Sequence, residues 1–254
     1  MFMTPCWLPD TVTTDLDRIV SRALLWGLES LDLRLVGGAT RRVPHVNEPP
    51  LRRRLEEAEL SVAAISPGLF EGPAMDRASA LDDLARLEDS LQFCGRFACP
   101  TVVISSFQGE GLPPAERLEL LRRAGDRASQ ASVTLAVLNE PGMSADSAAA
   151  LRTLLEAVDH PSINGALDLS TAGADPGDAA AMLVGKTAIV RYGSPDRAPD
   201  RPAGEVVKAL GDAGFAGPIS LVLAVGSSGR DGLQVSSRLI EALRKPAETT
   251  RKAR

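Results

Sequence analysis

Short apolar runs alternate with longer amphipathic stretches along the whole chain. The run 163–169 (INGALDL) is typical of the first kind, because it is mainly apolar and has Pro and Ser before it and Ser and Thr after it. Such a run predicts a buried β-strand. The stretch 77–94 is typical of the second kind, since its leucines at 81, 84, 87 and 91 fall on one face of a helix. The pattern therefore predicts strands and helices in turn.

The predicted strands are residues 2–8, 30–35, 61–66, 101–105, 133–138, 163–169, 187–192 and 219–225. The predicted helices that follow them are residues 16–24, 51–58, 77–94, 113–130, 144–158, 176–184, 204–213 and 233–243. We expect Thr14, with Asp17 three residues later, to cap the first helix. Ser144 is expected near the cap of the fifth helix.

Unbroken apolar strands between amphipathic helices indicate parallel strands that helices cover on their outer side. Eight strand–helix units are the number that closes a (β/α)8 barrel. The alternative, a doubly wound open sheet, is disfavoured because no G-x-G-x-x-G follows the first strand. We therefore predict an α/β fold with a single (β/α)8 TIM barrel over residues 1–246, followed by a flexible basic tail at 247–254.

Charge and hydropathy narrow the classes of partner. The net charge of −5 disfavours nucleic acid, whose phosphates are bound by an excess of Lys and Arg. No segment approaches the roughly 20 apolar residues of a membrane helix, and the start of the chain has no basic region before an apolar stretch. We expect no membrane association and a cytoplasmic location. The three cysteines lack paired metal spacing and are expected to be buried, reduced thiols.

Five stretches, in this order, carry a resemblance to a known family: WGLESLDLR (26–34), LSVAAISPGLF (60–70), SVTLAVLNEPG (132–142), NGALDLSTAG (164–173) and ALGDAGFAGPISL (209–221). They resemble the xylose-isomerase-like barrels, a family of sugar and sugar-phosphate isomerases and epimerases related to endonuclease-IV-like enzymes. The resemblance implies a divalent metal at the C-terminal mouth of the barrel. Its ligands would be a Glu ending strand five, an Asp and a nearby His after strand six, a His ending strand seven and a Glu ending strand eight.

This chain departs from that pattern at most ligand positions. Leu138, Thr171, Arg191 and Val222 stand where the resemblance implies Glu, His, His and Glu, and only Asp168 matches. A zinc-type site needs about four donors that include His or Cys. We therefore expect no cofactor, and a divalent metal is a disfavoured alternative.

Histidine is too scarce to repair this ligand set. The chain has only His45 and His160, and neither is near strands six to eight on the mouth side. Glu140 is the one further carboxylate that could join Asp168 at the mouth.

Three residues at predicted strand ends are candidate catalytic groups. Asp168 can act as a general base if burial raises its pKa, and Glu140 supplies a second carboxyl for proton transfer. Arg191 can stabilise a developing enolate oxygen. The alternative is structural: Asp168 and Arg191 form a salt bridge that replaces the metal, and Glu140 faces water.

The candidate substrate-binding residues are Arg34, His45, Asn139, Tyr192, Ser227 and Arg230. Arg34 and Asn139 are candidates because they lie at the ends of predicted strands. His45 lies in a long loop among arginines. Tyr192 offers a stacking surface for a sugar ring. Ser227 and Arg230 belong to GSSGRDG (226–232), ahead of the last helix, where barrels often bind phosphate.

Two functions remain open from the sequence. The first is a sugar isomerase or epimerase that acts on, or binds, a small hydroxylated molecule, either neutral or anionic, at a diverged, metal-free mouth. The second is a non-catalytic barrel that serves as a ligand sensor or as a subunit of an assembly. In both cases the expected partner is a small molecule, and a homo-oligomer is an open alternative.

Overall fold

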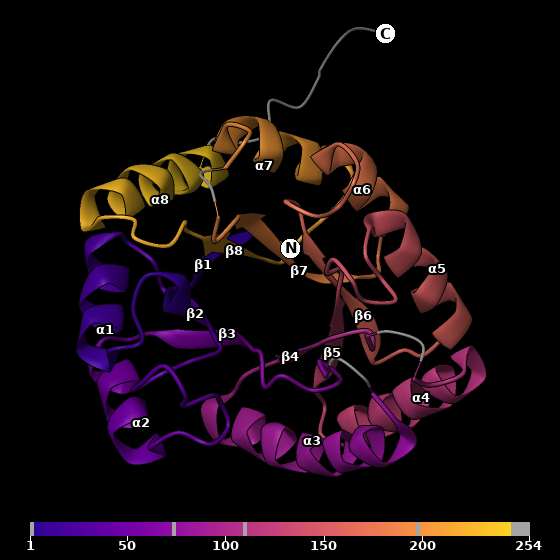
Figure 1. The fold of residues 1–254 in the computed structure, drawn as a ribbon. Coiled ribbons are helices and arrows are strands. Elements are labelled where there is room, and N and C mark those ends of the chain that lie inside the picture. Colours follow the sequence, from indigo (N-terminus) through magenta and orange to yellow (C-terminus); the bar gives the residue numbers. More distant parts are fainter. Residues whose placement is uncertain (1–2, 73–74, 109–110, 197–198, 245–254) are drawn as a thin grey trace, which may run out of the picture.

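A computed structural model of the chain describes residues 3–72, 75–108, 111–196 and 199–244. Its strands are β1 (Thr4–Leu8), β2 (Ser30–Leu33), β3 (Ser61–Ile65), β4 (Thr101–Ile104), β5 (Thr134–Leu138), β6 (Ile163–Asp168), β7 (Thr187–Gly193) and β8 (Pro218–Val222). They pair in parallel in sequence order, and β1 pairs with β8, so the sheet closes into a barrel (Figure 1). The predicted (β/α)8 barrel is confirmed. The predicted tail at 247–254 lies outside the described residues.

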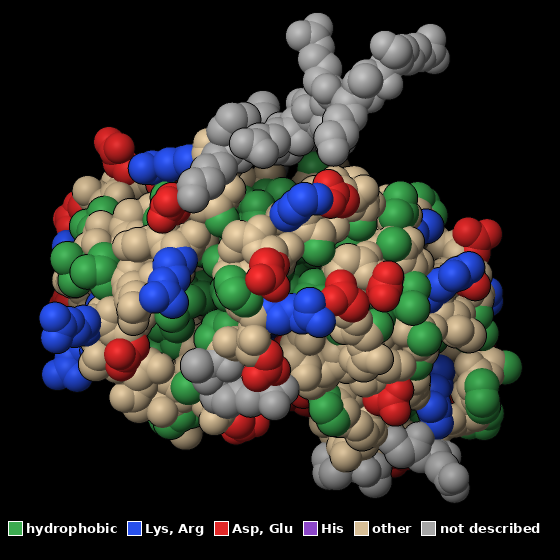
Figure 2. Space-filling view, turned by 90° about the horizontal axis from the view of Figure 1, so that it is seen from above, with side chains coloured by type: hydrophobic (Ala, Val, Ile, Leu, Met, Phe, Trp, Pro, Cys, Tyr) green, Lys and Arg blue, Asp and Glu red, His purple; other side chains and the backbone are tan. Residues whose placement is uncertain are grey.

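The helices form a ring around this barrel (Figure 1). They are α1 (Leu16–Leu25), α2 (Glu48–Glu57), α3 (Arg77–Phe97), α4 (Pro114–Gln130), α5 (Ala148–Val158), α6 (Pro176–Met182), α7 (Ala203–Asp212) and α8 (Gly229–Arg244), and a short 3-10 turn, η1 (Pro9–Thr11), follows β1. None of the helices in the described residues has both the length and the apolar character that a membrane span requires. On the side of α6, α7 and α8, cationic and anionic side chains are interspersed (Figure 2). Among the described side chains visible on that face, neither charge gathers into a patch.

Two helix starts differ from the sequence prediction. Asp15, and not Thr14, caps α1: its carboxylate accepts a hydrogen bond from the Arg18 amide at 2.9 Å. Ser147, and not Ser144, caps α5 by accepting from the Ala150 amide at 3.2 Å. In both cases the cap lies closer to the first helical residue, where its side chain reaches the free amides of the first turn.

The interior of the barrel has its own small core, separate from the main core between sheet and helices. Six buried residues form this inner layer: Cys6, Ala64, Val103, Ala136, Ala166 and Ile189. They are mostly small because eight strands leave little room at the axis. Side chains alternate along a strand, so the next inward position of each strand lies two residues further toward the C-terminal mouth. At that level Ser66, Ser105, Asp168 and Arg191 are polar, whereas Leu8 and Leu138 remain apolar.

Candidate functional site

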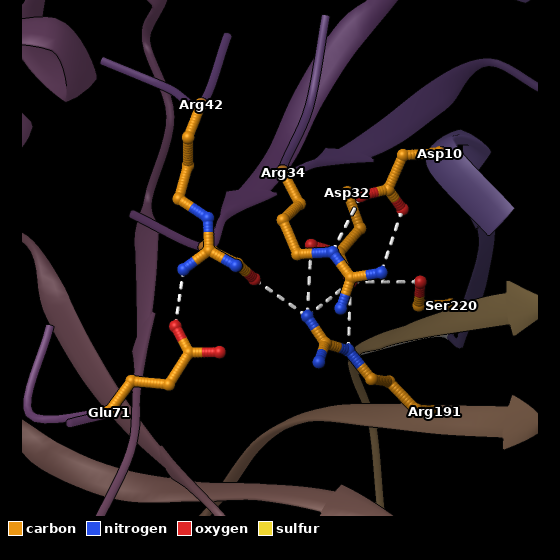
Figure 3. Close-up of polar contacts among 8 residues, drawn as sticks. Asp10, Asp32, Arg34, Arg42, Glu71, Arg191 and Ser220 are labelled. Atoms are coloured by element: carbon orange, nitrogen blue, oxygen red, sulfur yellow. Dashed lines mark hydrogen bonds and ion pairs between the residues drawn. The ribbon is translucent and has the colours of Figure 1, made fainter. Parts of the chain in front are cut away.

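A buried ion pair occupies the barrel interior directly above the inner apolar layer. Arg191 of β7 donates from Nε to Asp32 Oδ2 at 3.0 Å and from Nη2 to Asp32 Oδ1 at 3.4 Å (Figure 3). Nη2 also donates to the hydroxyl of Ser66 at 2.7 Å, and the hydroxyl of Ser220 donates to Asp32 Oδ2 at 3.0 Å. Asp32 is fully buried and Arg191 is 4% exposed. The four side chains form one network that joins β2, the end of β3, β7 and β8.

The register of the closed barrel explains this meeting. Arg191 and Ser220 are direct neighbours in the pairing of β7 with β8, and both side chains face inward. Asp32 is far from Arg191 in the sequence, but its side chain on β2 lies at the same level of the barrel interior. Burial alone lowers the pKa of Arg191, but the negative charges of Asp32 and Asp168 and the hydrogen bond to Asp32 outweigh it, so its pKa is raised. The guanidinium therefore stays charged at the centre of the barrel.

Two further arginines lie at the rim of the mouth, each paired with a carboxylate (Figure 3). Arg34 donates from Nε to Asp10 Oδ2 at 2.6 Å and from Nη2 to Asp10 Oδ1 at 3.2 Å. Arg42 pairs through Nη1 with Oε2 of Glu71. The Asp10 side chain is fully buried, whereas Arg42 and Glu71 are both about one-third exposed.

A small hairpin after β2 brings these two arginines together. Leu35 and Arg42 form an antiparallel bridge, and the Val43 amide donates to the Arg34 carbonyl at 3.0 Å. The chain reverses at Gly37 and Gly38, which adopt φ values of +79° and +145° that other residues rarely tolerate. The hairpin returns the chain to the mouth, and Arg42 thereby lines the same cavity as Arg34.

Two carboxyl groups at the mouth have raised pKa values. Burial raises the pKa of Glu140, and a 3.1 Å hydrogen bond from the Ser105 hydroxyl only partly opposes the rise. Burial also raises the pKa of Asp168, against hydrogen bonds from the Ser170 amide (2.8 Å) and hydroxyl (2.6 Å). A carboxyl group whose pKa moves toward neutrality is better suited to proton transfer.

A cavity of about 30 Å³ lies among the mouth side chains. Its lining residues are Arg34, Arg42, Ser66, Gly68, Glu71, Val103, Ile104, Ser105, Leu138, Glu140 and Arg191. This volume holds a water molecule or two but no sugar. Nη1 of Arg191 has no hydrogen bond to any described residue, which leaves one donor of the buried cation available to this cavity.

The three residues predicted as catalytic lie at the mouth, but their contacts differ from the expected ones. Arg191 does not form the salt bridge with Asp168 that was the structural alternative; it pairs with Asp32. The Asp168 carboxylate is instead engaged by Ser170, two residues later, although its charge still acts on the pKa of Arg191. Glu140 is partly buried against Ser105, so it does not simply face water.

Asn139 lies at the mouth with its amide turned toward the end of β6. Its Nδ2 donates to the Asp168 carbonyl at 2.9 Å and to the Thr171 hydroxyl at 3.0 Å, and its Oδ1 accepts from the Asp168 amide at 2.6 Å. Asn139 thus fixes the backbone that carries Asp168, and its side-chain amide is engaged in these hydrogen bonds.

The structure does not bring the remaining predicted binding residues to the mouth cavity. His45 is exposed and lies 4.0 Å from Asp89 of α3. Tyr192 points to the outer side of the sheet, where its hydroxyl donates to the Arg201 carbonyl at 2.7 Å and its ring lines a separate cavity of about 150 Å³. Ser227 lies in the loop after β8, and Arg230 lies in the first turn of α8 near Asp231.

The sequence prediction missed Asp32, and it also missed Asp10, Arg42, Glu71 and Ser220. One signal was available: an acidic residue within the apolar strand 30–33 (SLDL), in phase with Arg34 two positions later. Its partner could not be identified in this way, because Arg191 is 159 positions away and only the closed barrel brings the two together.

A barrel with a polar mouth at the carboxyl ends of its strands is the architecture of many small-molecule enzymes. The profile of the family described as Xylose isomerase-like TIM barrel matches residues 23–245. The chain belongs to this family. A comparison with curated protein sequences finds no significant match.

Solved structures resemble the chain over nearly its whole length. An L-ribulose 3-epimerase superposes with a TM-score of 0.78 at 17% identity and covers 100% of both chains. The probable 3-DHS dehydratase AsbF of Bacillus anthracis gives 0.75 at 16%, covering 94% of this chain and 99% of its own. The IOLI protein with a binding zinc atom gives 0.74 at 13%, covering 95% of this chain and 98% of its own. At these identities the likeness shows the fold alone.

The residues at the mouth do not fit a divalent metal. Leu138 packs on the inner apolar layer, and Val222 faces inward in phase with Ser220, so two of the implied ligand positions carry no donor atom. A third position carries the Arg191 cation. Over 3–72, 75–108, 111–196 and 199–244, no group of three or more His, Cys, Asp or Glu is placed to hold a metal ion. Among the implied ligand positions only Asp168 carries a carboxylate, and hard cations need several oxygen ligands.

Proposed function

We propose that the chain binds a small hydroxylated molecule at the barrel mouth and moves a proton on it without a metal, as an isomerase or epimerase. The observation that carries this proposal is the buried Arg191 cation, which keeps one nitrogen without a hydrogen bond to any described residue, beside a cavity that Glu140 also lines. A fixed positive charge in a dry site stabilises an oxygen that becomes negative during a reaction. The epimerase and dehydratase among the similar structures agree with chemistry of this class.

The proposed chemistry uses two carboxyl groups. One of Glu140 and Asp168, in its ionised form, removes a proton from a carbon next to a carbonyl, and the electron pair moves onto the carbonyl oxygen. Arg191 donates a hydrogen bond to that oxygen. For an epimerisation, the other carboxyl, in its protonated form, returns a proton to the opposite face of the same carbon while the carbonyl re-forms. For an isomerisation, it returns the proton to the former carbonyl carbon, while the proton of the neighbouring hydroxyl moves to the former carbonyl oxygen and the new carbonyl forms beside it. The raised pKa values of both groups support this exchange of roles.

A second candidate is a barrel that binds a ligand without turning it over. The small size of the mouth cavity, about 30 Å³, favours this candidate. Arg34, Arg42 and Glu71, all engaged in ion pairs, form part of the wall of this small cavity. In this case the barrel is a ligand sensor or a subunit of an assembly, and fold alone does not separate the two.

Exchange of a C–H hydrogen of the ligand with the solvent distinguishes the enzyme from the barrel that only binds. The protein, stripped of metal and kept in EDTA, is incubated in D₂O with a panel of neutral sugars, sugar acids and sugar phosphates. We expect deuterium to enter one C–H position of at least one compound, as measured by NMR. The variants Asp168→Asn and Glu140→Gln should each lower this exchange by about 100-fold or more while binding persists. Asp178→Asn, an exposed carboxylate of α6, is the matched control and should exchange like wild type.

The outcomes divide clearly. Binding without exchange contradicts the enzyme and supports the ligand sensor. Exchange that appears only after Mn²⁺ or Mg²⁺ is added contradicts the metal-free chemistry. If no compound binds at all, the small-molecule function itself is wrong.

A further inference from the structure

The two ion pairs at the rim of the mouth differ in how firmly they are held. Arg34 binds both oxygens of Asp10, whose side chain is fully buried. Arg42 touches Glu71 through a single nitrogen and a single oxygen, and their side chains are 32% and 38% exposed. A bidentate pair with a buried carboxylate is costly to break, because the carboxylate would be left without a partner. An exposed single contact is exchanged cheaply.

Arg34 is therefore the fixed cation of the rim, and Arg42 is the exchangeable one. Asp10 engages Nε and Nη2 of Arg34, and Nη1 has no hydrogen bond to any described residue. Arg42 lines the same cavity as Arg34. The Glu71 side chain is exposed enough to rotate into the solvent once another anion binds Arg42.

Departure of Glu71 leaves an unpaired cation at the cavity wall. Arg34 and Arg191 keep their carboxylate partners Asp10 and Asp32, whereas the partner of Arg42 is Glu71, which lines the same cavity. When Glu71 leaves, Glu140 is the remaining acidic residue of that lining, and it already accepts from the Ser105 hydroxyl. Planar guanidinium groups match the oxygens of carboxylate and phosphate.

Gly68 supplies the space in which Arg42 lies. A Cβ atom at this position would come within 2.7 Å of Glu71 Oε2 and would overlap Nη1 of Arg42. The backbone of Gly68 has φ of +77°, which also favours glycine. The Arg42 guanidinium thus rests against bare backbone at the edge of the cavity.

We propose that the ligand of the mouth carries a carboxylate or phosphate group that displaces Glu71 from Arg42 and is bound between Arg42 and Arg34. This inference rests on the proposed function and deepens it, since it names the class of ligand and the residues that select it. Displacement of Glu71 also opens the closed cavity, so the rim pair acts as a latch that an anionic ligand releases.

The test compares ligands and variants by calorimetric titration. D-Glucose, D-glucuronate and D-glucose 6-phosphate share a sugar and differ in charge, and inorganic phosphate probes the anion alone. We expect at least one charged sugar to bind about tenfold more tightly than glucose. Glu71→Gln should tighten binding of that anion about threefold, because the competing carboxylate is gone, and Arg42→Gln should weaken it about tenfold. The glucuronate and phosphate arms tell the two anions apart.

The matched controls are Glu156→Gln and Arg152→Gln, which alter an exposed pair of the same kind on α5. Both should leave all affinities unchanged. If glucose binds as well as its charged forms, or if Glu71→Gln and Arg42→Gln act no differently from the controls, the anion inference is wrong while the small-molecule function stands. If wild type binds none of the four probes and no member of the wider sugar panel, the proposed function fails together with it.

Discussion

Two successive layers inside the barrel are built from the same strands and filled in opposite ways. The lower layer consists of small apolar side chains such as Ala136, Ala166 and Ile189. The upper layer holds Asp32 and Arg191 with their serine partners, and Arg191 and Ser66 each lie two residues beyond a member of the lower layer. Apolar packing is the usual filling of such a barrel. A buried ion pair gives no net stability over an apolar filling of the same volume. We therefore infer that the upper layer serves the function of the mouth and not the stability of the barrel.

Cys6 marks the boundary between the two layers. It packs with the lower apolar side chains, yet its thiol interacts with Ser220 and with the charge of Asp32 above it. Burial, reinforced by the negative charge of Asp32, holds the pKa of this thiol far above its ordinary range. The thiol therefore stays neutral and belongs to the apolar side of the boundary.

Removal of one charge from the upper layer should have the largest effect. Arg191→Met leaves Asp32 fully buried with a serine hydroxyl as its remaining hydrogen-bond donor among the side chains of the layer. We expect the free energy of unfolding to fall by about 3–5 kcal/mol, measured by urea denaturation. A loss below about 1 kcal/mol would mean that Asp32 is hydrated or protonated in the variant and that the two layers are less distinct than described.

The double variant Asp32→Leu with Arg191→Met is the control for this experiment. It extends the apolar filling of the lower layer upward, so most of the lost stability should return. It should also lose ligand binding at the mouth.

A cavity in the lower layer should have the next largest effect. Ile189→Ala removes three methyl or methylene carbons from a fully buried side chain. We expect a loss of roughly 2–4 kcal/mol in the free energy of unfolding, with ligand affinity at the mouth almost unchanged. Urea denaturation measures the loss of stability, and calorimetric titration measures the ligand affinity. A large change in affinity would show that the layers are mechanically coupled.

The smallest effect concerns the pH dependence of stability. Burial raises the pKa of Asp168 above its ordinary value of 3.8, so the folded chain holds this proton over a pH range in which the unfolded chain has lost it. The contribution of Asp168 to stability is therefore greatest below the ordinary pKa and falls as the pH rises through the raised pKa. Asp168→Asn removes this loss, and the amide oxygen can still accept from Ser170.

Urea denaturation at pH 3 and pH 7 measures the difference. Stability of Asp168→Asn relative to wild type should be higher at pH 7 than at pH 3. The opposite order would mean that the Arg191 charge, and not burial, dominates the environment of Asp168.

The fold could be predicted from the sequence because its signal is local and repeated. Apolar strands and amphipathic helices alternate, and eight strand–helix units predict a closed barrel. Boundaries were less accurate where the chain makes a local structure of its own. The second strand was predicted to reach residue 35 but ends at Leu33, because Leu35 already pairs with Arg42 in the hairpin.

The site could be predicted in position but not in its pairings. Strand ends correctly placed Arg191, Glu140 and Asp168 at the mouth. The sequence offered Asp168 as an alternative partner of Arg191, because the two end neighbouring predicted strands, and the structure does pair them in register. In the structure the amide and hydroxyl of Ser170 engage the Asp168 carboxylate in a local turn. Arg191 extends to Asp32 instead, a choice that depends on closure of the whole barrel.

The Asp32–Arg191 pair also restricts how this chain can change over generations. Each charge is tolerated at the centre of the barrel only while the other is present. A substitution at position 32 therefore changes which residues are acceptable at position 191, and the reverse holds equally. A lineage that exchanges this mouth for another must alter two distant codons nearly together, so the pair acts as a barrier to gradual drift.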